Sequence, residues 1–283
     1  MNKKGRLFSA GVFLVLLLVP GVLIAGTVYD RVKATGSVRI GLLQDNAPLA
    51  FINEKNEWVG FEVDFADEVS QRIAQSMGKT LKVERVRADI ITRIEYVKSK
   101  QIDMSVASIT HTKEREKFVD FSITYFFDGQ SILAKKGRYN TVKDFIGKRM
   151  AVVQGTTNEQ NLISLMNSFG IKDPRKHIVS FQDESFCSLA LYQDKVAGWT
   201  ADSTMLIGFA AKEPGKFELV GEHFSIEPYG IGLPENDIEW KAAVNLAIQD
   251  VWKDGTYKKI YDKWFGSNTK YYLPMKGNIG PWP

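Results

Sequence analysis

Apolar and polar positions repeat along the chain with two periods, and each period predicts a different element. Apolar side chains recur at spacing four from Phe61 through Phe65 and Val69 to Ile73, so they line one face of a helix. Short apolar runs predict buried strands at 38–43, 81–86, 102–108, 131–136, 149–155, 177–181, 195–202, 217–221 and 229–233. Further helices are expected at 90–100, 141–147, 156–170, 184–194, 203–215 and 237–264. Repeated strand–helix units indicate an α/β fold with parallel sheets covered by helices.

The first 25 residues have the pattern of an export signal. A basic start is followed by an apolar run from Leu7 to Ile24. Cleavage after Ala25 or Gly26 is expected, although position −3 is then a large residue, Leu23 or Ile24. Because the apolar run is also about long enough to cross a bilayer, an uncleaved N-terminal anchor stays open. The sequence thus predicts an exported, periplasmic protein that could be retained at the inner membrane.

Composition narrows the class of protein. The chain has 283 residues, of which 44% are apolar and 25% charged, which is typical of a globular protein with room for two domains. The net charge is +4, but the leader contributes three positive charges and no negative one, so the remainder carries only +1. This near-neutral charge argues against a nucleic-acid partner. The single cysteine, Cys187, excludes an intrachain disulfide, so stability must come from the core.

In α/β sheets ligands bind where strands end and helices begin, so the strand-to-helix turns are the segments to inspect. The first turn lies within SITHTKEREKFVDFS (108–122), where Thr112 predicts the start of a short helix. An arginine follows at 115, in the first turn, where a cation opposes the helix dipole. A guanidinium matches a carboxylate bidentately, so Ser108, Thr110 and Arg115 could form a carboxylate clamp. The alternative is that Arg115 pairs with Glu114, Glu116 or Asp120 on the surface.

Two other turns offer complementary groups. In QGTTNEQ (154–160) two threonines open a helix, where they could cap it or donate to an anion. Asp202 ends a predicted strand and begins a helix, where it could be an N-cap or hold an ammonium group. No single turn is decisive. Together, however, an arginine, hydroxyl donors and an aspartate are what an α-amino acid zwitterion needs, since both of its charges are desolvated on binding.

The sequence resembles the polar amino-acid-binding receptors of ABC importers, a family that includes periplasmic histidine-, glutamine- and glutamate/aspartate-binding proteins. The resemblance runs from about Gly36 to Gly266. Its motifs are RIGLLQDNAPLAF (39–51), VGFEVDFADEVSQRIA (59–74), RIEYVKSKQIDMSVASITHTKEREKFVDFS (93–122), QGTT (154–157), EPYGIGLPEND (227–237) and DGTYKKIYDKWF (254–265). The resemblance implies a two-lobed periplasmic-binding-protein fold of type II, in which two hinge strands join the lobes and ligand is trapped between them.

The resemblance also implies lobe boundaries. Lobe 1 is expected at 36–126 and 225–266, and lobe 2 at 127–224. Hinge crossings are expected near 126–129 and 224–228. Residues 267–283 form a C-terminal tail rich in Pro, Gly and Asn, which is expected to wrap the surface.

Roles for individual residues follow from the same resemblance. Arg115 would grip the ligand α-carboxylate with help from Ser108 and Thr110, Asp202 would hold the α-amine, and Thr157 would donate from lobe 2.

Departures from the family pattern bear on the ligand side chain. Asn46 stands two residues before Pro48, where many relatives have an aromatic shelf, and this favours a polar ligand. Arg93 matches an arginine that helps hold the acidic side chain in glutamate/aspartate receptors, whereas a second such arginine is replaced here by Leu43. A glutamate/aspartate or glutamine type of ligand is therefore expected. The alternative for Arg93 is a charge on a helix surface.

The sequence is compatible with three classes of function. The favoured one is a monomeric, non-catalytic receptor that closes on a polar amino acid and delivers it to an ABC permease, without cofactor or metal. The second is an enzyme on the same fold, such as a cyclohexadienyl dehydratase, which needs an acid or base beside the substrate. Among the histidines only His111 lies in a ligand turn, and we interpret it as a rim residue. The third is a membrane-tethered amino-acid sensor, which rests only on the weak cleavage site.

Overall fold

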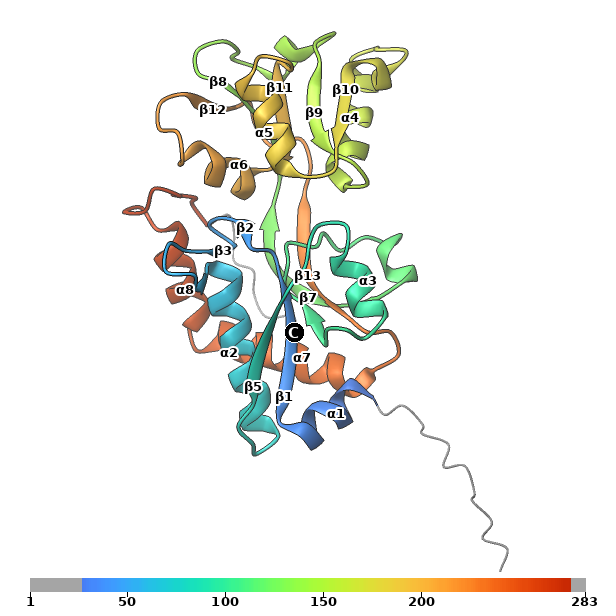
Figure 1. Ribbon diagram of the computed structural model, residues 1–283, viewed down its shortest axis with the longest axis vertical. Coiled ribbons are helices and arrows are strands. Elements are labelled where there is room, and N and C mark those ends of the chain that lie inside the picture. The colour runs from blue at the N-terminus through green and yellow to red at the C-terminus, as the bar shows by residue number, and fades with distance from the viewer. Residues whose placement is uncertain (1–26, 276–283) are drawn as a thin grey trace, which may run out of the picture.

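The computed structural model describes residues 27–275, which form two α/β lobes joined by extended strands (Figure 1). Lobe 1 is built on a five-stranded sheet in the order β5-β1-β6-β13-β7, and lobe 2 on one in the order β10-β9-β11-β8-β12. The lobe 1 strands are β5 (Lys82–Arg87), β1 (Ser37–Leu42), β6 (Met104–Ser105), β13 (Glu227–Leu233) and β7 (Asp120–Asp128). The lobe 2 strands are β10 (Ile178–Phe181), β9 (Met150–Val153), β11 (Gly198–Asp202), β8 (Gln130–Lys135) and β12 (Phe217–Val220). The predicted two-lobed α/β fold is confirmed.

Lobe 1 packs its helices on an aromatic core. Its helices are α1 (Val28–Thr35), α2 (Phe61–Ser76), α3 (Arg93–Lys98), α7 (Ile238–Lys253) and α8 (Thr256–Phe265), and a small sheet adds β2 (Asp45–Asn46), β3 (Ala50–Ile52) and β4 (Trp58–Val59). The apolar stripe of α2 is buried, since Phe61 and Phe65 are fully inaccessible. Phe61 lies edge-on to Phe126 of β7 and Tyr257 of α8. Burial of this stripe explains why the helical periodicity in the sequence is so regular.

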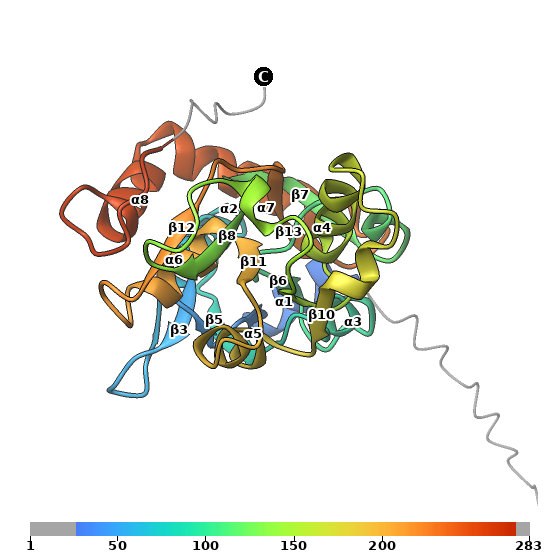
Figure 2. The ribbon, with the colours of Figure 1, turned by 90° about the horizontal axis from the view of Figure 1, so that it is seen from above.

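Lobe 2 has a core on each face of its sheet. Its helices are α4 (Thr157–Ser168), α5 (Glu184–Tyr192) and α6 (Ser203–Ala210), with short 3-10 helices at Val142–Phe145 and Pro174–His177. On β8, Leu133 belongs to one core cluster and its neighbour Ile132 to another, because successive side chains of a strand point to opposite faces. Seen from above, α4, α5 and α6 surround the strands (Figure 2). Both faces of the sheet are thus covered.

The chain crosses between the lobes twice. It leaves lobe 1 at the end of β7 and enters β8 through Gly129, and it returns from β12 into β13. The two crossing strands pair with each other, with Glu227 opposite Asp128 (Figure 1). Polar residues at this pairing therefore lie where both lobes meet.

The lobes also touch beside the hinge. Ile207 of α6 and Ala211, just beyond its end, pack against the lobe 1 core. Gly208 lies so close to the turn after β2 that a Cβ atom built on it would be 1.6 Å from the Ala47 carbonyl oxygen. On lobe 1, Ile90 packs against the lobe 2 core. The structure therefore has the two lobes in contact.

Several element predictions need correction. The helix expected from Thr112 is only a three-residue 3-10 helix, Arg115–Lys117, although the Thr112 hydroxyl does accept from the Arg115 N–H at 3.2 Å. The helix expected at 237–264 is two helices, because Gly255 adopts φ 79° between α7 and α8. Helix α1 was not predicted. Its N-terminal N–H groups are satisfied by a distant side chain, Asp237, which only the tertiary fold brings there.

Parts of both ends of the chain lie outside the residues that the structure describes. The predicted leader and its cleavage site lie outside the described residues, as does the last part of the predicted tail. The described part of the tail lies on lobe 1, where Tyr271 is buried and the Leu273 N–H donates to the Phe265 carbonyl at 3.1 Å. Within residues 27–275, no helix is both long and apolar enough to cross a membrane.

Candidate functional site

The first turn of interest follows β6 and carries Ser108 and Thr110. Ser108 adopts φ 52°, a left-handed conformation that is uncommon for a residue other than glycine. Its N–H and its hydroxyl both donate to Glu62 Oε1, at 2.7 and 3.0 Å. Glu62 is fully buried in the first turn of α2, and burial raises the pKa of its carboxyl. A side chain from another element therefore holds the strained turn in place.

Arg115 approaches this turn from the short 3-10 helix. Its Nη1 donates to the Thr110 carbonyl at 2.7 Å, so the guanidinium lies beside the turn that carries Ser108 and Thr110. Burial, together with the nearby charge of Arg93, lowers the pKa of Arg115 to about 10, while Asp202 and Glu227 oppose the shift. The alternative ion pairs of Arg115 with Glu114, Glu116 or Asp120 do not form within the described residues. Glu116 instead pairs with His111 at 2.7 Å.

Arg93 is buried and not on a helix surface. It begins α3, is 5% exposed, and its Nη1 donates to the carbonyls of Ala107 and Ser108, the latter at 2.9 Å. Its Nε has no hydrogen-bond partner within the described chain. Burial lowers its pKa, and Asp202 is the first of the anions that oppose this. Two desolvated guanidinium groups close together repel each other, so an anion between them would be stabilised.

Asp202 ends β11 and faces the junction from lobe 2. It does not cap α6 with its side chain; its Oδ2 accepts from the Tyr229 hydroxyl. Its buried Oδ1 has no well-aligned hydrogen-bond partner within the described chain, while the neighbouring Asn158 side chain lowers the pKa of the carboxyl. Burial raises the pKa of Asp202 to about 8, with further contributions from the anions Asp128 and Glu227. An unpartnered buried carboxylate oxygen is costly, and a cationic hydrogen-bond donor would remove that cost.

The capping role expected of Asp202 is carried out by Asp128, which the sequence analysis did not single out. Asp128 accepts from the Thr204 N–H at 3.1 Å and from the hydroxyls of Ser203 and Thr204, each at 2.5 Å. It stands on β7 at the hinge, far from α6 in sequence. No local signal could reveal a cap supplied across a hinge.

Glu227 is a second residue that the sequence analysis did not single out. It is 1% exposed and begins β13. Its Oε2 accepts from the hydroxyls of Thr110 (2.7 Å) and Thr157 (2.9 Å), and its Oε1 accepts from Asn161 (2.8 Å) and Ser225 (2.6 Å). The carboxylate therefore joins lobe 1 to lobe 2. Its only signal in the sequence was its place in the EPYG motif.

The seven predicted residues fall in one connected group. Asn46 Nδ2 donates to Ser108 Oγ at 3.0 Å, and Thr110 and Thr157 meet on Glu227. Arg93, Arg115 and Asp202 lie within electrostatic range of one another. The structure thus brings together hydroxyls, two arginines and an aspartate from both lobes. Their role as ligand contacts stays a prediction.

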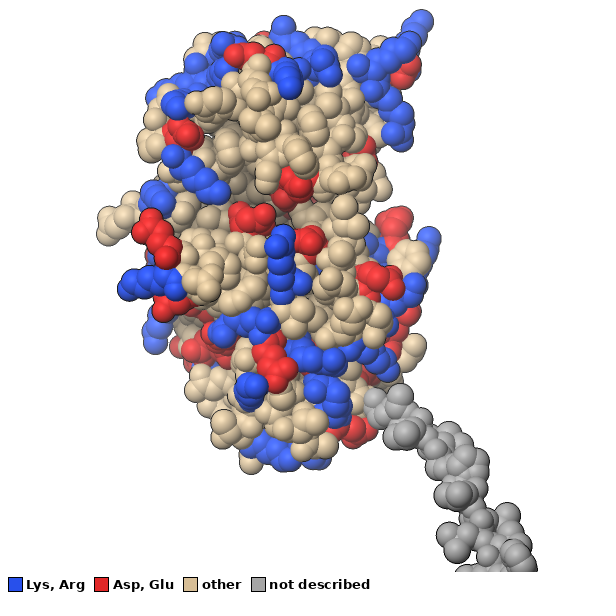
Figure 3. All heavy atoms as spheres, viewed as in Figure 1, with Lys and Arg blue, Asp and Glu red and all other residues tan. Residues whose placement is uncertain are grey.

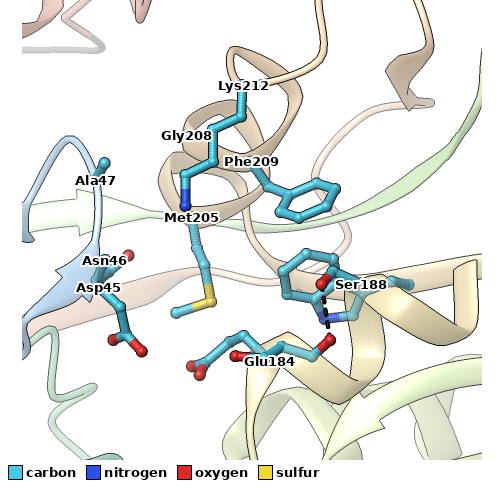
Figure 4. A pocket seen from close by; sticks show the side chains of 11 residues that line it. Asp45, Asn46, Ala47, Glu184, Ser188, Met205, Gly208, Phe209 and Lys212 are labelled. Carbon is cyan, nitrogen blue, oxygen red and sulfur yellow. Dashed lines mark hydrogen bonds between the residues drawn. The ribbon is translucent and has the colours of Figure 1, made fainter. Parts of the chain in front are cut away.

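Two cavities open beside this group at the lobe junction. The first, of about 130 Å³, lies between β2 of lobe 1 and α5 and α6 of lobe 2 (Figure 4). The second, of about 390 Å³, lies between the segment 87–92 and the start of α5. They share Asp45, Glu184 and Ser185. Neither cavity is lined by Arg115 or Asp202; Asn46, which contacts Ser108, connects the first cavity to the turn that carries the charged group.

Asp and Glu side chains are numerous at this junction. In the space-filling view, red atoms gather on the face between the two lobes (Figure 3). The second cavity is lined by Asp45, Asp89, Asp183 and Glu184, against one cation, Arg87, which pairs with Asp89 at 3.4 Å. No cluster of three or more His, Cys, Asp or Glu side chains suited to a metal ion occurs within residues 27–275.

Comparison with known proteins identifies relatives over most of the chain. The family model described as "Bacterial extracellular solute-binding proteins, family 3" matches residues 38–267. The glutamine-binding protein GlnH of an ABC transporter from Bacillus subtilis is 30% identical, covering 82% of this chain and 82% of the relative. An L-glutamate/L-aspartate-binding protein from Pseudomonas aeruginosa is 29% identical, covering 98% and 91%.

A solved structure has a fold similar to that of this chain. An ancestral arginine-binding protein bound to glutamine superposes with a TM-score of 0.72 at 33% identity, covering 82% of this chain and 99% of that one. The similarity therefore extends over both lobes of that protein.

Proposed function

The chain belongs to the bacterial extracellular solute-binding proteins of family 3, and we propose that it captures an α-amino acid between its two lobes. One observation carries the proposal: Arg115 and Asp202, of opposite charge and both desolvated, face the same junction from different lobes. The unpartnered Oδ1 of Asp202 and the repulsion between Arg93 and Arg115 are deficits that an α-ammonium and an α-carboxylate would each remove.

Each predicted residue then has a role. Arg115 pairs with the α-carboxylate, assisted by Ser108 and Thr110 on the same turn. Asp202 accepts from the α-ammonium. Thr157 donates from lobe 2, Asn46 stands toward the ligand side chain, and Arg93 adds positive charge beside the α-carboxylate.

Binding would act through lobe closure. Ligand that contacts both lobes binds the closed form better and so shifts the population toward it. Glu227 accepts hydrogen bonds from Thr110 of lobe 1 and Thr157 of lobe 2 at the hinge, which favours a defined closed geometry. We propose that the closed, monomeric protein delivers its amino acid to an ABC permease from the periplasm, after removal of the leader or while held by it. The named relatives bind glutamine, or glutamate and aspartate, and one belongs to an ABC transporter.

The proposal is for a receptor without turnover. The alternative, a dehydratase on this fold, requires an acid or base beside the substrate. His111, the histidine nearest the candidate turn, pairs with Glu116 and stacks on Phe121 at a centroid distance of 4.4 Å, which supports a rim position.

A thermal-shift screen of the purified protein against the twenty amino acids tests the function. A rise in melting temperature with one or a few of them is expected, because a ligand stabilises the state it binds. The bound amino acid should be recovered unchanged after prolonged incubation. No shift with any amino acid, or conversion of the bound compound, would refute the proposal.

A further inference from the structure

The cavity at the lobe junction presents acceptors to its interior. Glu184 at the start of α5 and Asp45 on β2 both line it, and Figure 4 shows their carboxylates directed toward each other across it. Glu184 is half-buried and Asp45 is exposed. The one cation that lines this cavity is Lys212, an exposed side chain beyond the end of α6. The cavity therefore has a net negative charge.

A third acceptor is independent of these carboxylates. Asn46 is 4% exposed, lines the cavity, and its Oδ1 has no hydrogen-bond partner within the described chain. The Ser108 hydroxyl donates to Glu62, so it must accept from the Asn46 amide nitrogen. That pair of bonds sets the orientation of the amide and leaves its oxygen available. A buried carbonyl oxygen without a donor is unfavourable, and a ligand that supplied one would stabilise the site.

The balance of charged side chains at the lobe junction also favours a cationic ligand. Two arginines, Arg93 and Arg115, face Asp45, Asp128 and Glu227, and also Asp202 and Glu184, whose ionised forms a bound cation would favour. An α-amino acid backbone is neutral overall, because its carboxylate and ammonium cancel. The excess of negative charge is therefore left for the ligand side chain to neutralise.

The cavity walls suit an aliphatic stem. Met205 and Phe209 of α6 and Trp199 of β11 line it on the lobe 2 side. Apolar walls that end at carboxylates are suited to a side chain of methylene groups with a charged end.

We propose that the cavity between Asp45, Asn46 and Glu184 receives the guanidinium or ammonium end of a cationic amino-acid side chain, so that this protein selects arginine- or lysine-like ligands. The inference rests on the proposed function, since the α-carboxylate and α-ammonium are held as described above. It replaces the acidic side chain that the sequence suggested: Arg93, the residue expected to hold such a side chain, instead donates to backbone carbonyls. Burial raises the pKa of Glu184 to about 7, with Asp45 adding to the rise, and a cation between them would offset both effects.

Isothermal titration calorimetry with arginine, lysine, glutamine and glutamate at pH 8 tests the selection. Arginine or lysine should bind at least tenfold more tightly than glutamine, and glutamate should bind most weakly. Glu184→Gln should weaken binding of the cationic amino acid at least tenfold while changing glutamine affinity less than threefold. This follows because a charge-assisted hydrogen bond is about twice as strong as a neutral one.

Two further variants complete the design. Lys212→Met removes the competing cation and should tighten binding of arginine or lysine severalfold. Glu213→Gln removes a partly exposed carboxylate that lines neither cavity and pairs with Lys216, so it should change no affinity.

The outcomes are separable. Tightest binding of glutamate or glutamine, or equal loss of arginine and glutamine affinity in Glu184→Gln, would overturn cation selection and leave the receptor function standing. Failure of the wild-type protein to bind any amino acid would overturn the receptor function itself.

Discussion

Replacement of Gly208 by alanine should separate lobe closure from the stability of each lobe. In the structure, a Cβ atom at this position of α6 would lie 1.6 Å from the Ala47 oxygen and 2.7 Å from its carbonyl carbon. Ordinary van der Waals contact begins at about 3.4 Å, so the lobes must move apart by nearly 2 Å on this side. The contacts of Ile207 and Ala211 with the lobe 1 core would weaken with that movement.

The magnitude follows from the cost of inserting one methyl group into a packed contact, about 1–3 kcal/mol. If ligand affinity depends on closure, it should fall by a factor of roughly 5 to 150, since about 1.4 kcal/mol corresponds to tenfold. The same substitution should stabilise α6 itself, because alanine is better than glycine in a helix by about 1 kcal/mol. Loss of affinity without loss of stability is therefore the expected signature.

Calorimetric titration with the ligand found in the screen, beside urea unfolding of the ligand-free protein, measures the two effects. Ala210→Gly, two positions along the same helix, is the matched control: it should lower the stability and leave the affinity unchanged. An affinity of Gly208→Ala within twofold of wild type would refute the reasoning that this contact belongs to the ligand-bound form.

Three other predictions concern the charged group. Arg115→Ala should remove most of the affinity for every amino acid, measured by titration, because the α-carboxylate loses its counter-charge; near-normal binding would contradict its assigned role. Glu227→Gln should lower the free energy of unfolding in urea by about 1–3 kcal/mol, because four donors converge on that buried carboxylate and an amide cannot accept from all of them; a change below about 0.5 kcal/mol would show that the donors find other partners. The raised pKa of Asp202, about 8 in the fold, means that the folded protein binds its proton more tightly than the unfolded chain does. The melting temperature of the ligand-free protein should therefore fall as pH rises from about 4 to 8. It should fall less with a bound amino acid, because the ligand ammonium favours the ionised form of Asp202. A melting temperature that rises over this range in Asp202→Asn and wild type alike would contradict the raised pKa of Asp202.

Local patterns in the sequence determined most of the elements. The stripe at Phe61 and Phe65 predicted α2 correctly, because a helix that covers a core must place apolar residues at its own period. The turns that carry Ser108, Arg115 and Asp202 were also identifiable, since polar residues at the ends of buried strands are local features. Family motifs then supplied the two-lobed architecture.

Interactions across the hinge could not be predicted from the sequence and became visible only in the tertiary structure. Asp128 caps α6 from 75 residues away, and Glu227 gathers donors from residues 110, 157, 161 and 225. Neither role leaves a periodic or spacing signal, because the partners are brought together by the pairing of β7 with β13.

Direction and burial of side chains were likewise beyond the sequence. It offered Arg93 as either a surface charge or a contact for an acidic ligand, whereas the fold buries it against the carbonyls of the Ser108 turn. Glu184 looked like an ordinary first-turn residue of a helix until α5 was placed opposite Asp45. Local sequence determines which residues stand at the edge of a sheet, but the packing of one lobe against the other decides which charges face each other without water, and that sets the chemistry of the site.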